Sequence, residues 1–183
     1  SGTAPGAAGA AVAGTAAGAP RACEYGEAYI SRHYAPADTE AADYRRERLF
    51  YTAENARYID AVRSAIEERY PGWRLSDRER KAKLLLLSAL LYEASTHANT
   101  SGVFKAYHKG FGGHGKDALS RIMAPMRLEE PPLIDGTERC RAEERDAAAF
   151  LEGRSADLVY LDPPYNSHQY GSNYFMLNTI ARW

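Results

Sequence analysis

The stretch "ADLVYLDPPYNSHQYGSNYF", residues 156–175, decides the fold class of this chain. It opens with the apolar run Leu158–Leu161 and changes at Asp162 into an acid, two prolines and a tyrosine. A short, continuous apolar run bounded by turn residues is typical of a strand buried in a parallel sheet. Proline fixes φ and donates no backbone hydrogen bond, so the chain leaves the sheet after Asp162. We therefore predict a buried strand over 156–161.

The residues after this strand offer hydrogen-bond acceptors beside a flat ring. Asp162 and the carbonyl groups of Pro163 and Pro164 are acceptors, and Tyr165 presents an aromatic face. In α/β sheets, ligands bind beyond the carboxyl ends of the strands. Two acceptors and a stacking plane suit a planar base with an exocyclic amino group, such as an adenine that has left the duplex. On the tetrapeptide alone, a proline-rich turn with Asp162 as a cap is the alternative.

Three segments resemble bacterial adenine-specific DNA methyltransferases of the restriction–modification type. They are "RLFYTAENARYIDAVR" (48–63), "ANTSGVFKAYHKGF" (98–111) and "LVYLDPPYNSHQYGSNYFMLNTIARW" (158–183). The likeness extends over most of residues 24–183. The resemblance implies an α/β fold, namely a partial Rossmann-like methyltransferase sheet with a helical insertion. It also implies site-specific methyl transfer from S-adenosylmethionine to the exocyclic amino group of adenine in duplex DNA.

The resemblance further implies roles for individual residues. Asp162 and the Pro163 carbonyl would accept hydrogen bonds from the adenine amino group, Pro164 completes the motif, and Tyr165 would stack on the flipped base. Asp146, which precedes the predicted strand, and Asp162 would lie near the cofactor. The histidines and cysteines show no metal-ligand spacing, and displacement at a sulfonium methyl needs no metal, so we predict no metal site.

A second group of residues is expected to contact DNA. The loop that precedes residue 118 is rich in glycine, lysine and aromatic residues, and lysines that neutralise phosphates position a protein on DNA. Asn173 and Tyr174 could shape the base pocket or could simply begin a helix. The alternative for the loop is a solvated, flexible segment. The predicted DNA-contacting residues are Lys105, Tyr107, His108, Lys109, Lys116, Asn173 and Tyr174.

By composition and pattern, the chain divides into a flexible start and one domain. The Ala/Gly-rich segment 1–22 offers too little apolar area to offset the entropy of ordering it. Residues 23–183 form the predicted partial methyltransferase domain. Within it we predict a helical region over 53–97, a DNA-contacting loop region over 99–133, and the catalytic strand with its Asp-Pro-Pro-Tyr motif over 137–183.

Capping residues locate two helices in the helical region. Thr52 can cap the first, which a Tyr-Pro-Gly sequence stops. Ser76 and Glu79 form a capping box that opens the second. This second helix contains "LLLLSALLYEA" (84–94), which is apolar on nearly all sides, so we predict a central buried helix.

Charge and cysteine content limit the way in which the protein can bind DNA and the cellular compartment in which we expect it. The net charge of −1 means that DNA binding depends on a local basic patch. The resemblance implies duplex DNA and a cognate restriction endonuclease as the partners. Cys23 and Cys140 form no disulfide framework, which indicates a reducing compartment, and we expect a cytoplasmic protein. No stretch approaches the roughly 18 apolar residues of a membrane span.

One element of the family pattern is missing from its usual place. Relatives carry a glycine-rich Phe-x-Gly-x-Gly loop at the cofactor, after their first strand; ahead of residue 24, only "AGTAAGA" (13–19) has a passing likeness to it. We therefore expect a fragment that lacks the first βα unit and the C-terminal end. The alternatives are a DNA-binding remnant without cofactor binding, and a methyltransferase that acts on RNA or on a protein amide.

Overall fold

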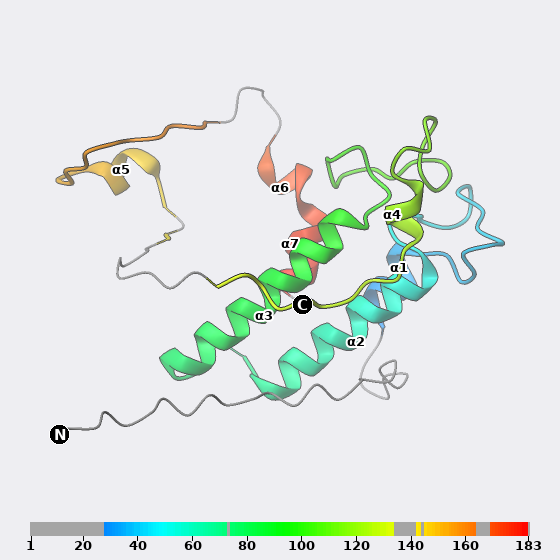
Figure 1. Cartoon of the computed structure of the whole chain (residues 1–183), viewed down its shortest axis with the longest axis horizontal. Helices are drawn as coiled ribbons and strands as arrows, with labels where there is room; N and C mark the ends of the chain where they lie inside the picture. Colours follow the sequence, from blue (N-terminus) through cyan, green and yellow to red (C-terminus); the bar gives the residue numbers. More distant parts are fainter. Residues whose placement is uncertain (1–27, 73, 134–141, 144, 164–168, 183) are drawn as a thin grey trace, which may run out of the picture.

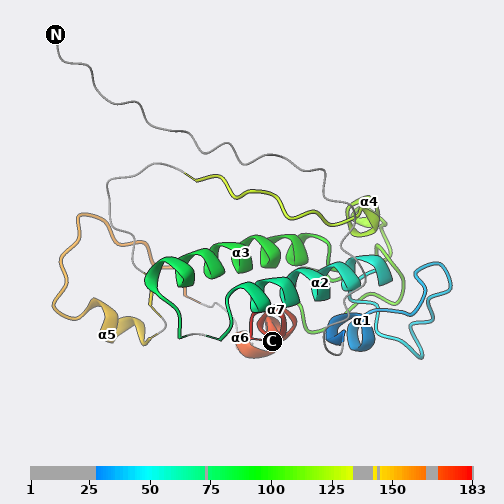
Figure 2. The same ribbon diagram turned by 90° about the horizontal axis from the view of Figure 1, so that it is seen from below.

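The computed structural model describes residues 28–72, 74–133, 142–143, 145–163 and 169–182, and in this part of the chain it contains helices and no strand. The long helices α2 and α3 lie side by side, α7 crosses beneath them, and α1 packs against α2 (Figures 1 and 2). α5 lies apart from α1, α4 and α7 in both views. The helices are α1 (Tyr29–Tyr34), α2 (Ala53–Arg69), α3 (Asp77–Thr96), α4 (Leu119–Met123), α5 (Ala147–Leu151), α6 (Tyr170–Asn173) and α7 (Phe175–Arg182).

The predicted caps begin the two long helices. The Thr52 hydroxyl accepts a hydrogen bond from the Asn55 amide at 3.1 Å at the start of α2. At the start of α3, the Ser76 hydroxyl accepts from the Glu79 amide, and the Glu79 carboxylate accepts from the Ser76 amide at 3.0 Å. Both predictions are confirmed, because a cap depends only on residues within one turn of the chain.

The core lies where α1, α2, α3 and α7 meet. Apolar residues of α2 such as Ile59 and Ile66 are buried, as their spacing predicts, and they belong to the same cluster as Met176 and Ile180 of α7. The buried Asp60 carboxylate holds α1 against α2, since it accepts hydrogen bonds from two amides in the first turn of α1, at 2.8 Å each. The short helix α1, which would not be stable alone, is thus held by its packing against α2 and by the Asp60 carboxylate, which caps its first turn.

The prediction that α3 is buried on nearly all sides is wrong. Leu87, Leu90 and Ala94 are buried, but Leu84 is 50% exposed and Tyr92 is 68% exposed. The reason is that α2 and α7 pack on one face of α3. In the part of the chain that the structure describes, the opposite face stays largely open.

The structure also differs from the prediction of a buried strand over 156–161. The side chains of Leu158, Tyr160 and Leu161 are 86%, 84% and 71% exposed. A parallel strand is buried only when neighbouring strands pair with it and helices cover both faces of the sheet. Neither is found around this segment within the described ranges, and residues 137–141 of the region predicted to hold the catalytic strand lie outside them. The Rossmann-like sheet therefore stays a prediction.

A buried ionic network ties α2 to the start of α3 and to α7. The Lys83 ammonium group, which is fully buried, donates to the Glu67 carboxylate at 2.8 Å and to the carbonyl groups of Tyr70 and Gly72. Arg63 donates to the same carboxylate at 2.9 Å and to the Ile180 carbonyl near the end of α7 at 3.0 Å. A cation at this end of α7 is favourable because the last carbonyl groups of a helix lack partners within the helix.

Among the described helices, none is both long enough and apolar enough to cross a membrane.

Candidate functional site

The predicted catalytic motif follows an extended, exposed segment. Asp162 and Pro163 lie at its end, in neither a helix nor a strand, and both are exposed. Pro164 and Tyr165 lie outside the described residues. The structure therefore leaves the Asp162 carboxylate open to a ligand, and the arrangement of the four residues stays a prediction.

The chain is helical from Tyr170 onward, and there it meets the predicted DNA-contacting loop. Tyr174 joins α6 to α7, and Asn173 is the last residue of α6. The Phe104 amide donates a hydrogen bond to the Asn173 carbonyl at 2.7 Å, and the rings of Phe104 and Tyr174 are in contact. The structure thus brings together Lys105, Asn173 and Tyr174, three of the residues predicted to contact DNA.

Asn99 organises the loop, and sequence reasoning missed it. Its side-chain amide donates to the Leu49 carbonyl at 2.9 Å and to the His108 carbonyl at 3.3 Å, and its side-chain oxygen accepts from the Gly112 amide at 3.1 Å. The residue is fully buried. A buried amide group with all of its bonds made fixes a loop in one conformation. The only signal in the sequence is a polar residue three positions after the end of the apolar helix α3.

This network argues against the alternative of a freely flexible loop, and it gives the predicted residues different environments. Tyr107 is fastened to the core: its ring contacts Phe50 and its hydroxyl donates to a backbone carbonyl at 3.3 Å. Lys116 donates to the Phe111 carbonyl at 2.6 Å within the loop itself. Lys105 and Lys109 are exposed, whereas His108 is half-buried. Lys116 is exposed as well, but because its ammonium is bonded within the loop, phosphate contacts are best placed at Lys105 and Lys109.

Buried polar atoms near the site are not all satisfied. The side-chain oxygen of Asn173 is buried and receives no hydrogen bond from any described residue. Such an acceptor is costly to leave without a donor. A hydrogen-bond donor to the Asn173 side-chain oxygen must therefore come from outside the described contacts.

The residues predicted to bind the cofactor are not gathered into a pocket. The Asp146 carboxylate caps α5 by accepting a hydrogen bond from the Ala149 amide at 3.0 Å. No contact links Asp146 to Asp162 in the part of the chain that the structure describes. The glycine-rich segment 13–19 lies outside that part. The described residues therefore do not form a site that fits S-adenosylmethionine.

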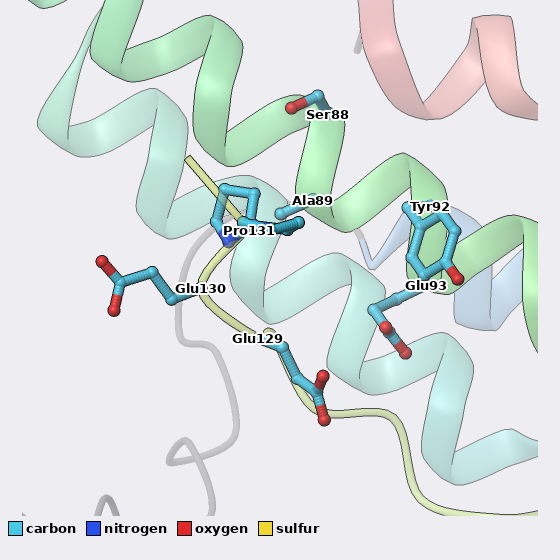
Figure 3. A pocket seen from close by; sticks show the side chains of 8 residues that line it. Ser88, Ala89, Tyr92, Glu93, Glu129, Glu130 and Pro131 are labelled. Atoms are coloured by element: carbon cyan, nitrogen blue, oxygen red, sulfur yellow. The ribbon is translucent and has the colours of Figure 1, made fainter. Parts of the chain in front are cut away.

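A cavity of about 520 Å³ lies elsewhere, between α3 and the segment that follows α4 (Figure 3). Tyr92 and Glu93 of α3 and the glutamates at 129 and 130 surround it. None of the predicted site residues lines this cavity, so it is separate from the candidate site. Within the described residues, no three histidine, cysteine, aspartate or glutamate side chains are grouped as metal ligands.

Comparisons with known proteins place the chain in a family. Residues 25–183 match the family model described as D12 class N6 adenine-specific DNA methyltransferase. The chain is 38% identical over 135 residues to the Type II methyltransferase M.NlaIII of Neisseria lactamica, and 39% identical over 138 residues to the Type II methyltransferase M.CviAII of Paramecium bursaria Chlorella virus 1. Each match covers 74% of this chain and 37% of the relative.

A third relative is the Modification methylase LlaI of Lactococcus lactis subsp. lactis, 32% identical over 140 residues, which are 76% of this chain and 21% of the relative. The chain thus spans well under half the length of these relatives. No solved structure matches it significantly. The resemblance drawn from the three sequence segments is confirmed.

Proposed function

Since the chain belongs to the D12 class of N6 adenine-specific DNA methyltransferases, we propose that it acts in transfer of a methyl group to the exocyclic amino group of adenine at a specific site in duplex DNA. The observation that carries the proposal is the sequence Asp162-Pro-Pro-Tyr165 within the segment that matches the family. The exposed Asp162 carboxylate and the exposed Lys105 of the loop support it.

The residues of this chain act on the base. The Asp162 carboxylate and the Pro163 carbonyl accept hydrogen bonds from the two amino hydrogens of adenine. This interaction draws the nitrogen lone pair out of conjugation with the ring and makes the nitrogen a better nucleophile. Tyr165 stacks on the base and offsets part of the few kcal/mol that leaving the duplex costs. When bound, S-adenosylmethionine supplies an electrophilic methyl group.

The DNA is held by the loop organised by Asn99. Lys105 and Lys109 contact phosphates, and Asn173 and Tyr174 lie beside the DNA. Asp146 stays a predicted cofactor residue, although its carboxylate serves as a cap in the structure. We further propose that a restriction endonuclease of the same sequence specificity is the functional partner, and that the protein works in the cytoplasm.

The test is production of N6-methyladenine. The chain is incubated with S-adenosylmethionine and unmodified duplex DNA of mixed sequence, and the digested nucleosides are analysed by mass spectrometry. We expect Asp162→Ala to reduce N6-methyladenine by at least about a hundredfold, since it removes an acceptor that positions the reacting nitrogen. Asp157→Ala, which changes another exposed carboxylate of the same segment, is the matched control and retains activity.

Equal activity in the Asp162→Ala and Asp157→Ala variants would contradict the role assigned to Asp162. RNA and a glutamine-bearing peptide are assayed in parallel, because the same acceptors would suit their amino or amide nitrogens. Methylation of either in preference to DNA would redirect the proposal to that substrate.

A second candidate function is that of a DNA-binding remnant, which the exposed Lys105 and Lys109 of the loop would serve without a cofactor. Calorimetric titration with S-adenosylmethionine separates the two candidates. Measurable binding supports the methyltransferase. A folded chain that binds DNA in a salt-dependent manner but does not bind the cofactor supports the remnant.

A further inference from the structure

Three aromatic rings form a ladder beside the segment that follows the catalytic motif. The rings of Tyr170 and Tyr174 stack with centroids 5.4 Å apart and planes 16° from parallel, and the ring of Phe104 lies 6.0 Å from that of Tyr174. We call these three residues the aromatic ladder. Phe104 is 5% exposed, Tyr174 is 38% exposed and Tyr170 is 54% exposed. The ladder is therefore anchored in the core at one end and open to solvent at the other.

A positive charge stands next to the ladder. Lys105 directly follows Phe104 and is exposed, and no acidic side chain is paired with it among the described residues. The hydrogen bond from the Phe104 amide to the Asn173 carbonyl fixes the backbone of the loop to α6, the helix that carries Tyr170. The backbone that carries the cation and the rings is thus held in place by a contact that needs no ligand.

We propose that the aromatic ladder is a stacking surface for an unpaired nucleobase of the DNA other than the target adenine, with Lys105 on the adjoining phosphate. This inference rests on the proposed function, because removal of the target adenine from the duplex leaves the thymine opposite it unpaired. Every base has such a face, so a ring that stacks on it binds without regard to sequence. The exposed ring of Tyr170 lies at the solvent end of the ladder, where a further ring can stack.

Charge distinguishes a nucleobase from the adenine ring of the cofactor as the occupant. A nucleotide carries a phosphate one bond from its sugar, which complements Lys105. S-adenosylmethionine carries no phosphate; beside its ribose it has a positive sulfonium, which the lysine would repel, and its carboxylate lies at the far end of the methionine chain. A base in DNA therefore fits the combination of rings and cation, whereas the methyl donor does not.

Two strands of equal length test the inference: a short thymidine strand and an abasic strand with the same phosphates. Dissociation constants are measured by fluorescence anisotropy. The unaltered chain is expected to bind the thymidine strand about tenfold more tightly than the abasic strand, a preference within the range that one base–aromatic stack produces. Tyr170→Ala is expected to bind both strands equally, and Tyr170→Phe, which keeps the ring, to retain the preference.

Two further variants separate stacking from charge. Lys105→Gln is expected to weaken binding of both strands alike and to reduce the slope of log K against log salt by about 0.7, the value for one phosphate of a single strand. Tyr92→Ala removes a tyrosine of α3 that is more exposed than Tyr170 and lies outside the ladder, and it is expected to change the binding of neither strand. If Tyr170→Ala does not fold by circular dichroism, Tyr170→Leu replaces it.

Several results would overturn the inference. One is an unaltered chain without a preference for bases, and another is a Tyr170→Ala variant that keeps the preference. A third is loss of the preference when free S-adenosylmethionine is added, which would assign the ladder to the cofactor. The proposed function fails separately, through absence of N6-methyladenine. Asp162→Ala should abolish methylation and leave the preference for bases unchanged, so the two failures are distinguishable.

Discussion

Glu67 shows how much one residue contributes to this fold. Its carboxylate receives hydrogen bonds from Lys83, Arg63 and the Gly72 amide, and thereby joins α2, the turn that follows it and α3. Partial burial alone would raise the pKa of Glu67, but the hydrogen bonds and the charge of Lys83 lower it to about 2. A carboxyl group whose pKa is lowered by folding stabilises the folded state only while it is ionised.

The low pKa of Glu67 predicts a specific dependence of stability on pH. Its contribution is complete above the ordinary carboxyl pKa of about 4.5 and is lost as the pH falls towards about 2. We expect Glu67→Gln to lower the free energy of unfolding at pH 7 by about 1–2 kcal/mol, an amount reduced by solvent screening of this partly exposed group. Urea unfolding at pH 7 and at pH 3 measures the change.

At pH 3 the difference between Glu67→Gln and the unaltered chain should be smaller than at pH 7. Glu68→Gln, which changes an exposed carboxylate one residue along α2, is the control and should have little effect at either pH. An equal loss of stability at both pH values would show that Glu67 contributes by its shape and not by its charge.

At the scale of elements, the loop from residue 99 to residue 118 depends on a single side chain. Asn99 bonds to the backbone on both sides of the loop and to the segment before α2. Removal of this amide leaves buried carbonyl groups without donors, each costing about 1–3 kcal/mol. The loop should therefore loosen before the helices do, since local opening needs less free energy than global unfolding.

We predict that Asn99→Ala increases hydrogen exchange of the amides at His108 and Gly112 while those in the middle of α3 stay protected. The Lys105 side chain should lose its fixed place at the same time, so binding of duplex DNA should weaken. Asn178→Ala, which changes an exposed asparagine of α7, is the control. Unchanged exchange in the loop would mean that the other backbone contacts hold it without Asn99.

The elements also show which predictions sequence alone can support. The caps at Thr52 and Ser76 were predictable because each involves residues within one turn. The burial of α3 and of the run after residue 156 was not, because burial depends on partners distant along the chain. For the site, the chemistry of Asp162 is read from its motif, but the hydrogen bond between Phe104 and Asn173 joins segments that no local pattern relates. Asn99 was missed for the same reason.

At the scale of the whole molecule, apolar surface is left uncovered at two places in the described part of the chain. One is the open face of α3 with Leu84 and Tyr92, and the other is the extended run Leu158–Leu161. Scattered exposed apolar residues are ordinary, whereas a contiguous run is not. The run also combines β-branched, aromatic and aliphatic residues with no charge, and such a segment pairs readily with another strand.

The last prediction concerns this run. We expect the chain to self-associate as its concentration rises, because the backbone and side chains of 158–161 are available for strand pairing between copies. Tyr160→Lys should reduce association, since a charge repeated along paired strands is repulsive and costly to desolvate. Sedimentation velocity over a range of protein concentrations measures the effect. Tyr92→Lys, which places the same charge on the open face of α3, is the control: if it reduces association as much as Tyr160→Lys does, self-association occurs through apolar surface in general and not through the segment that leads to Asp162.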